Sequence, residues 1–571
     1  MADNSHVSGL RVRVRAPFDA VVRNRRIVGA ALMALMLVAC SRGAAPAQKP
    51  SDSAPGNTKT GGTLTFVQRS DPTSWDIWGA QRTIDPTRSA ADMVFSPLII
   101  PAADPNGGCD IKFEGELAES WKYLDPKTIE VKLRPGVKWH NKPPASGRDL
   151  TSDDVVFTFE DRFKQGGAGA TFLGKTVFDH AEAVDPLTVK LYLKMPYANF
   201  LEDLYTTGWA WIVPRGFAGP DGKEWLEQPE KSWVGTGPFM FKEFQPGVKV
   251  VFEKNPNYFK SGKPYVDRVE MLIIADESTK LAQMRSGSLD VYPSAGPRSA
   301  ADLKRTNSDM TVKSCPSRFT ESLNFPLDKA PWGDVRVRQA VSMAINREAL
   351  IKTVLNGQDA FAGILWPNDP EAIKLEDFPP EYRKYLEYRP DEAKQLLAQA
   401  GFPNGFSTKL IFTPAYGSPW NELSEAIVTM LRGVGIQADL ELMEYGAYIR
   451  QVVVNGEFDA PVMRYVNRFS ISDMAGGNLW SKHPAVDTTR LKKVPDEKLD
   501  GMIEEYWATF DTAKRKDQAK LIQYHLAETV PQFFNPTWGN ALIAQPWVKN
   551  IAWRGNEKFF TNIIDQAWID K

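Results

Sequence analysis

The chain has 571 residues, 43% of them hydrophobic and 11% aromatic, so it can bury a sizeable core and, at ordinary domain sizes, form two or three domains. Its 69 Lys and Arg residues against 70 Asp and Glu residues leave a formal net charge of -1. A protein with so little net charge lacks the long-range field that draws proteins onto nucleic acid. We therefore expect a large globular protein without a nucleic-acid partner.

The first forty residues have the pattern of an export leader. Six arginines precede an apolar run at residues 27–39, which is short for a bilayer span and typical of a secretory signal peptide. The run ends in Leu-Val-Ala-Cys, which resembles a bacterial lipobox. We predict a lipoprotein signal peptide at 1–39 and a lipid on Cys40 that anchors the exported protein to the membrane. An uncleaved anchor is the alternative, and the pair Arg25 and Arg26 leaves Sec and twin-arginine export both open.

Residues 40–60 are predicted to be a flexible tether, because Ala, Pro, Ser, Gly, Thr and Lys dominate there without apolar periodicity. Export would place two further cysteines, Cys109 and Cys315, in an oxidising compartment, in which a disulfide can form. The presence of two cysteines does not by itself imply that they pair. The five histidines lie too far apart in the sequence for a metal site, and no Cys-x-x-Cys motif occurs. We expect neither a metal nor a cofactor.

The folded part is predicted to alternate strands with helices. Residues 63–67 are β-formers after a Gly-Gly pair, and residues 120–123 and 128–133 alternate as in a half-buried hairpin. Helices are expected at 155–164, after capping residues at 151–154, and in a stretch capped by Asp334 whose apolar face includes Val337, Ala340, Val341, Ala344, Ile345 and Ile351. Further helices are expected at 391–400, 422–432 and 512–529. Such alternation favours α/β lobes.

One motif suggests an enzyme. Residues 169–176 fit the phosphate-binding loop pattern, and residues 272–276 resemble its companion strand, which ends in Asp276. A working loop follows a buried strand and opens a helix, whereas here a predicted helix precedes the motif and a strand-like run follows it. The alternative of a P-loop nucleotide hydrolase is therefore disfavoured. Paired carboxylates such as Asp153 and Asp154 are interpreted as helix caps or solvated faces, and we predict no catalytic residue.

Short blocks throughout the mature chain resemble family 5 extracellular solute-binding proteins, which include the dipeptide-, oligopeptide- and nickel-binding subunits of ABC importers. The blocks lie at residues 61–65, 70–74, 117–121, 133–140, 151–157, 234–239, 255–258, 334–340 and 400–406. The resemblance implies an α/β, type II periplasmic-binding-protein fold with two lobes joined by a hinge and an extra subdomain inserted in the first lobe. It places lobe I at 61–90, 232–300 and 538–571, the inserted subdomain at 91–231 and lobe II at 301–537.

The resemblance also implies a function. The protein is expected to act as a monomer, periplasmic or otherwise outside the cytoplasm, that captures a peptide or peptide-like solute between its lobes. It is expected to deliver the solute to the permease subunits of an ABC importer without chemistry. An anionic solute, an oligosaccharide or a metal chelate in the same role remains open as the ligand.

The resemblance further suggests which residues bind the ligand. In the family an aspartate that holds the peptide amine follows the strand that reads 458–467 here, and Arg468 occupies that position. An ammonium beside a guanidinium is unfavourable, so Arg468, with Arg464, favours an anionic or N-blocked ligand if both face the cleft; Asp473 is the alternative partner for an amine. The predicted ligand-binding residues are Trp75, Arg298, Tyr445, Arg464, Tyr465, Asn467, Arg468, Trp480, Asn535 and Trp538. For the tryptophans, packing in a core is the competing interpretation.

Overall fold

The structure is a computed structural model. It describes residues 58–72, 74–78, 85–102, 109, 112–164, 172–208, 211–217, 228–317, 319–355, 357, 363–416, 420–467, 470–483, 490–537, 539–552 and 561–571. The predicted signal peptide, the lipid site Cys40, most of the predicted tether, Arg468 and Trp538 lie outside the described residues. Residues 56–571 form one compact unit. None of the helices in the described part of the chain is long and apolar enough to cross a bilayer.

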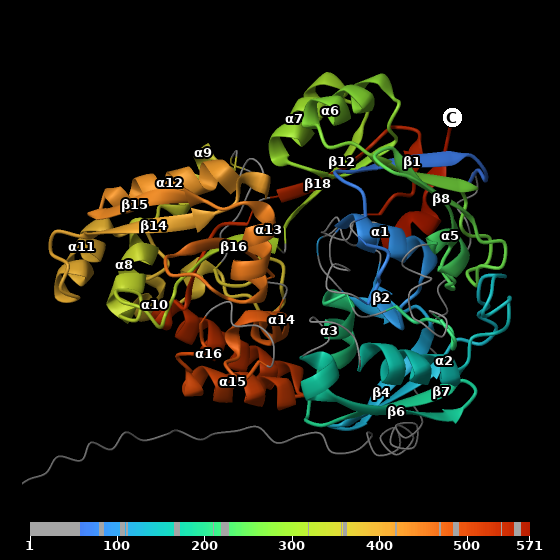
Figure 1. Ribbon diagram of the computed structural model, residues 1–571, viewed down its shortest axis with the longest axis horizontal. Coiled ribbons are helices and arrows are strands. Elements are labelled where there is room, and N and C mark those ends of the chain that lie inside the picture. Colours follow the sequence, from blue (N-terminus) through green and yellow to red (C-terminus); the bar gives the residue numbers. More distant parts are fainter. Residues whose placement is uncertain are drawn as a thin grey trace, which may run out of the picture. The chain divides into compact units, whose positions relative to one another are not determined.

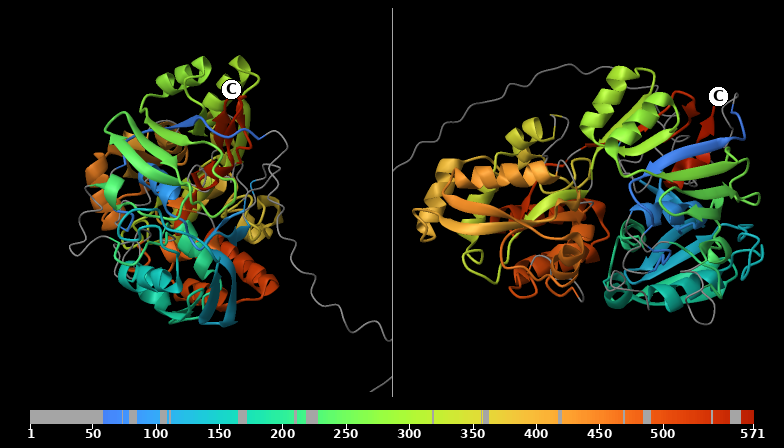
Figure 2. Two further views of the ribbon diagram at one scale, coloured as in Figure 1. Left: turned by 90° about the vertical axis from the view of Figure 1, so that its right-hand side faces the viewer. Right: turned by 45° about the horizontal axis from the view of Figure 1, so that its top comes forward.

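A seven-stranded sheet contains the start of the folded chain. Its strands, in spatial order, are β12 (Thr311–Pro316), β18 (Gly539–Ala544), β11 (Val291–Ala295), β1 (Thr63–Gln68), β10 (Arg268–Ile273), β9 (Lys249–Lys254) and β8 (Phe239–Gln245). The strand predicted at 63–67 is confirmed as β1, which pairs in parallel with β10 and β11. Helices α6 (Glu277–Ser286) and α7 (Pro297–Thr306), in light green, pack beside β11 and β18 (Figure 2). Asp276 caps α6 by accepting a hydrogen bond from the Thr279 amide at 2.8 Å, a structural role.

A four-stranded antiparallel sheet contains the predicted hairpin. Its strands, in spatial order, are β4 (Ala118–Asp125), β5 (Thr128–Leu133), β7 (Thr188–Leu193) and β6 (Phe178–Asp185). The helix predicted at 155–164 is confirmed as α2 (Ser152–Phe157), which continues in a π-helical segment at Thr158–Phe163. The last residues of the phosphate-loop pattern form a π-helical turn, Leu173–Val177, that leads into β6. A strand thus follows the motif, whereas a nucleotide hydrolase requires a helix at this point, and the structure argues against that interpretation.

A five-stranded sheet forms the other large α/β layer. Its strands, in spatial order, are β15 (Ile436–Leu442), β14 (Phe406–Phe412), β16 (Val462–Asn467), β13 (Phe319–Asn324) and β17 (Gln532–Phe534). The expected helices at 391–400, 422–432 and 512–529 are confirmed as α11 (Pro390–Gln399), α12 (Trp420–Arg432) and α16 (Thr512–Thr529). Of these, α12 packs along β15 and β14 (Figure 1).

The apolar stretch after Asp334 forms two helices. Asp334 caps α8 (Val335–Ala344), as predicted, by accepting a hydrogen bond from the Arg336 amide. The helix ends at Ala344, however, and α9 (Arg347–Thr353) begins after Asn346, whose side chain accepts a hydrogen bond from the Ala349 amide. A second cap within the periodic run thus interrupts a helix that the apolar spacing alone predicts to be continuous.

The remaining elements are short. The other helices are α1 (Asp85–Val94), α3 (Phe200–Thr206), α5 (Pro229–Ser232), α10 (Pro380–Arg383), α13 (Tyr445–Tyr448), α14 (Ile471–Met474) and α15 (Glu497–Ala508). The π-helical segments Ile449–Val454 and Ala475–Leu479 continue α13 and α14, and 3-10 turns lie at Leu375–Asp377, Pro414–Tyr416 and Thr561–Gln566. Two-stranded ladders join β2 (Ile99–Pro101) to β3 (Phe113–Gly115) and β19 (Val548–Lys549) to β20 (Trp568–Ile569).

Two connections join the seven-stranded sheet to the five-stranded sheet. One runs from β12 to β13 and the other from β17 to β18. Because β12 pairs with β18 and β13 pairs with β17, the connections run as an antiparallel pair (Figure 1). Residues 301–316, which the sequence-based prediction assigns to lobe II, belong to α7 and to the seven-stranded sheet. The reason is that β12 pairs along its whole length with β18, more than two hundred residues away.

Cys109 and Cys315, whose pairing the sequence leaves open, form a disulfide with a Cα–Cα distance of 5.8 Å. Cys315 lies on β12, directly before the chain crosses to β13. The bond closes a loop with a sequence separation of 206 residues. It therefore ties the segment around Cys109, which precedes β3, to one of the two crossing connections.

Candidate functional site

The five-stranded sheet carries a cluster of aromatic rings around Arg464. Tyr465 on β16 stacks on Trp420 of α12 at 4.9 Å between ring centroids and meets Tyr416 edge-on at 4.8 Å. Tyr416 in turn lies 5.8 Å from Tyr445 and 6.3 Å from Tyr448. We call these five rings with Arg464 the tyrosine cluster. The structure thus brings together three of the predicted ligand residues, namely Tyr445, Arg464 and Tyr465.

Arg464 itself is buried, with 5% of its surface exposed. Burial lowers the pKa of its guanidinium, while the nearby phenols of Tyr448 and Tyr416 act in the opposite direction. The phenol of Tyr448 donates a hydrogen bond to the carbonyl of Met463 at 2.8 Å, which fixes this ring against β16. Burial also raises the pKa of Tyr448 above its usual value, so that the ring is neutral at ordinary pH.

Three rings of the tyrosine cluster, Tyr416, Trp420 and Tyr448, are absent from the sequence-based prediction. A signal for one of them exists, because Tyr445 and Tyr448 are three residues apart and therefore share a helix face. The other two lie on a 3-10 turn and at the start of α12. Only the pairing of β14 with β16 brings that part of the chain beside Arg464.

Two predicted polar residues lie at the crossing connections. Asn467 ends β16 and pairs with Phe319 at the start of β13. Asn535 follows β17 directly and is completely buried. Both therefore belong to the backbone region where the chain passes from one large sheet to the other.

Arg298 joins the two large sheets through their helices. It lies on α7, beside the seven-stranded sheet, and its guanidinium is 3.4 Å from the carboxylate of Glu422 on α12 and 3.5 Å from the carbonyl of Thr353. The side chains of Arg298 and Glu422 are 57% and 39% exposed. An ion pair this exposed contributes little to stability.

Trp75 and Trp480 have the contacts of core residues. Trp75 packs edge-on against Trp233, Phe241 and Phe244 at 5.0 to 5.3 Å. Trp480 is 7% exposed, and its indole N–H donates to Glu504 at 3.0 Å. These contacts favour the packing interpretation that competes with ligand binding for both tryptophans.

A second polar contact links α3, which follows the four-stranded sheet, to α14 beside β16. Asp203 accepts hydrogen bonds from the phenol of Tyr197, at 2.7 Å, and from the hydroxyl of Ser472. The indole N–H of Trp507 donates to Ser472 at 3.1 Å. Ser472 lies 269 residues from Asp203 in the sequence, and no motif identifies this network in advance. Asp473, the alternative amine partner, is buried next to it on α14.

Burial raises the pKa of Asp203 from 3.8 to about 6. Its hydrogen bonds from Ser472 and Tyr197 and the positive charge of Arg515 oppose this rise, and the charge of Glu371 adds to it. Between about pH 4 and pH 6 the folded protein therefore holds a proton that the unfolded chain has released. Stability from this group is present at acid pH and is lost as the pH rises through the window.

We expect the stability of the wild type to fall by about 2 kcal/mol relative to Asp203→Asn between pH 4 and pH 7, since the amide has no charge to bury. Urea unfolding of both proteins at several pH values measures the difference. Asp439→Asn is the control, because the Asp439 side chain is 86% exposed, and this variant should follow the wild type. A wild type and an Asp203→Asn variant with parallel pH profiles would contradict the assignment.

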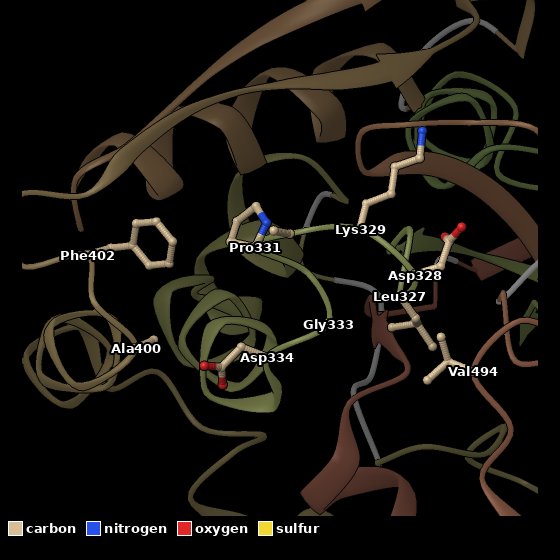
Figure 3. Close-up of a pocket in the computed structure, with 10 residues that line it drawn as sticks. Leu327, Asp328, Lys329, Pro331, Gly333, Asp334, Ala400, Phe402 and Val494 are labelled. Carbon is tan, nitrogen blue, oxygen red and sulfur yellow. The ribbon is translucent and has the colours of Figure 1, made fainter.

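A surface pocket of about 500 Å³ lies elsewhere, around the loop 327–334 (Figure 3). Phe402 and Val494 lie at its two ends in this view. Its acidic groups are already paired, because Asp334 caps α8 and binds Arg336, and Asp328 lies 3.6 to 3.8 Å from Lys493 and Arg490. None of the predicted ligand residues lines this pocket. Among the residues that the structure describes, no three His, Cys, Asp or Glu side chains are grouped to hold a metal ion.

Two large α/β sheets joined by a pair of crossing connections define the class of the protein. It has the type II periplasmic-binding-protein fold, and the solved structure of DppA from Helicobacter pylori, in complex with the peptide STSA, matches it with a TM-score of 0.73. That match has 21% identity and covers 90% of this chain and 99% of the other. The model of bacterial extracellular solute-binding proteins, family 5 Middle, matches residues 112–485. The chain belongs to this family, whose members are solute-binding proteins of ABC importers that work outside the cytoplasm.

Curated relatives agree with the family. The dipeptide-binding protein of Escherichia coli strain K12 is 30% identical over 436 residues, which cover 73% of this chain and 79% of the relative. The glutathione-binding protein GsiB of Pectobacterium atrosepticum is 29% identical over 382 residues, which cover 66% and 70%. The family resemblance seen in the sequence blocks is therefore confirmed.

Proposed function

We propose that this chain is the substrate-binding subunit of an ABC importer for a peptide or peptide-like solute. The observation that carries the proposal is the pair of crossing connections between two α/β sheets, together with the tyrosine cluster on one side of them. The family membership and the dipeptide-binding relative support the ligand class.

We assign lobe I to the seven-stranded sheet, the inserted subdomain to the four-stranded sheet and lobe II to the five-stranded sheet, with the first boundary of lobe II after Pro316. The solute binds between lobes I and II, which approach by bending at the two crossing connections. A loaded, closed molecule then differs in outline from an open one, and permease subunits can distinguish the two. The ion pair of Arg298 and Glu422 already spans the lobes in this structure, and we expect it to break when the lobes open.

The same proposal includes the membrane anchor and excludes catalysis. A lipid on Cys40 would hold the monomeric protein at the membrane surface, and a tether at 40–60 would let it reach the permease. Capture and release need no bond to be made or broken, so the solute leaves unchanged. The ligand-binding residues are proposed to be those of the tyrosine cluster with Arg298, Asn467, Arg468, Asn535 and Trp538.

The full-length chain, purified in mild detergent without denaturation, is expected to carry a bound peptide or peptide-like solute. Native mass spectrometry should show the complex, and the released solute should be unchanged after prolonged incubation. Adding that solute back at about a hundred times its dissociation constant should stabilise the protein by about 2.7 kcal/mol. Chemical conversion of the solute during incubation would indicate an enzyme. The peptide function would be contradicted if the purified protein carried no peptide and added peptides did not stabilise it.

A further inference from the structure

Five arginines are buried among the described residues, and four of them are paired within the protein. They are Arg88, Arg338, Arg347, Arg464 and Arg490. Arg338 donates to four backbone carbonyls, and Arg347 donates to three carbonyls and a hydroxyl. Arg88 and Arg490 each donate to a carbonyl and lie within 4 Å of an aspartate. Each of these four guanidinium groups thus has either several backbone acceptors or a nearby carboxylate, as the desolvation of a buried charge requires.

Arg464 is the exception. Its Nε and Nη1 atoms are buried and have no hydrogen-bond acceptor within the described chain. The ion pairs among described residues include none with Arg464, and the neighbours that act on its charge are the phenols of Tyr448 and Tyr416. A neutral phenol does not compensate a buried positive charge. The cation therefore has no counter-charge among these residues.

The position of Arg464 on β16 is near the second crossing connection. Its cross-strand partner on β13 is Ser322, which is opposite Phe534 on β17, so that Arg464 shares a sheet face with the start of the second crossing connection. On the lobe I side, the charge of Arg69, which follows β1, is close enough to act on the phenol of Tyr416. Tyr416 is thus close enough to an arginine of each lobe for a charge interaction with both.

We propose that Arg464 binds a carboxylate of the captured solute, an inference that rests on the proposed function of the site. A carboxylate supplies the missing negative charge, and its two oxygens match the planar donors of a guanidinium. The rings of the tyrosine cluster surround this point with apolar faces and phenol groups, which suit the main chain of a peptide-like solute better than a small inorganic anion. The proposed ligand is therefore a peptide-like acid whose carboxylate binds to Arg464 of lobe II.

Substitution of Arg464 separates a ligand role from a structural role. Arg464→Met removes a charge that the ligand-free protein buries without a partner, so the thermal midpoint of the ligand-free protein should stay unchanged or rise. Arg347→Met is the matched control, since it is an equally buried arginine in the same lobe whose loss strips donors from several carbonyls. Its thermal midpoint should fall.

The binding experiment uses the full-length wild type and both variants, freed of co-purified solute by dialysis against mild denaturant and refolding. The probes are trialanine and trialanine amide, which differ only in the C-terminal carboxylate, and glutathione, which has a C-terminal carboxylate and a second carboxylate on its γ-linked glutamate. We expect the wild type to bind at least one carboxylate probe, and Arg464→Met to bind it about ten- to a hundredfold more weakly, as the loss of a charged hydrogen bond implies. A preference for trialanine over its amide assigns the C-terminal carboxylate. Binding of glutathione without binding of trialanine assigns the second carboxylate of glutathione, on its γ-linked glutamate.

Three outcomes would overturn the inference while the importer function stands. The first is equal binding of trialanine and its amide without binding of glutathione, and the second is an unchanged affinity of Arg464→Met for the probe. The third is a fall in the ligand-free thermal midpoint of Arg464→Met as large as that of Arg347→Met. If native mass spectrometry of the untreated wild type instead finds a non-peptide acid whose retention depends on Arg464, the carboxylate inference holds and the peptide proposal fails. A neutral or cationic solute retained equally by the wild type and Arg464→Met overturns the inference.

Discussion

Asp154→Ala is expected to lower the free energy of unfolding by about 3 kcal/mol, because it removes the acceptor of five hydrogen bonds at once. The buried carboxylate of Asp154 accepts from both terminal nitrogens of Arg148, at 2.7 and 2.5 Å, and from the indole N–H of Trp139 at 3.1 Å. It also accepts from the backbone amides of Thr151 and Arg215. Alanine leaves the buried indole N–H of Trp139 without this acceptor and removes the negative charge that faces Arg148.

The neighbouring carboxylate provides a matched control. The Asp153 side chain is 58% exposed and lies 3.7 Å from Arg215. Asp153→Ala should therefore change stability by less than about 1 kcal/mol. Urea denaturation of the wild type and both variants tests the difference, and similar losses for the two variants would show that the Asp154 network is not what stabilises this part of the chain.

Loss of the disulfide between Cys109 and Cys315 should destabilise the folded protein by about 5 kcal/mol, since the bond closes a loop with a sequence separation of 206 residues and restricts the unfolded chain. The double variant Cys109→Ser and Cys315→Ser is expected to have a markedly lower thermal midpoint than the oxidised wild type. Differential scanning calorimetry in the absence of reductant measures the change.

Reduction provides the control for the serine variant. A reducing agent should lower the midpoint of the wild type toward that of the double variant and leave the double variant unchanged. If the reductant has no effect on the wild type while free thiols are titrated in the untreated protein, the two cysteines are not paired in solution.

Local sequence patterns determine much of the fold. The alternation at 128–133 predicts a strand of the four-stranded sheet, and the spacing of apolar residues with a cap at Asp334 predicts α8. Both signals are local, because a strand or helix face and its cap lie within one turn or a few residues. The same is true of the family blocks, which identify the fold from short segments. The interruption at Asn346 is missed because one cap lies inside a periodic run.

Such local patterns identify only some of the residues of the candidate site. The resemblance to the family identifies Arg464, Tyr465 and Tyr445 as candidates, but Tyr416 and Trp420 join them only through the pairing of β14 with β16. The boundary of lobe II likewise depends on the pairing of β12 with β18. Neither pairing can be predicted from the sequences of the strands alone, because strand pairing is a contact between distant segments.

By itself, then, the sequence determines most helices and strands of this protein, its family and the residue types at the candidate site. The tertiary structure decides which charges have partners. Arg338 and Arg464 are both buried arginines, yet one donates to carbonyls of a distant segment and the other has two buried nitrogens without an acceptor among the described residues. Burial and hydrogen bonding depend on groups brought together by folding, and these distinguish Arg464, which we propose binds a ligand, from Arg338, whose guanidinium donates to backbone carbonyls.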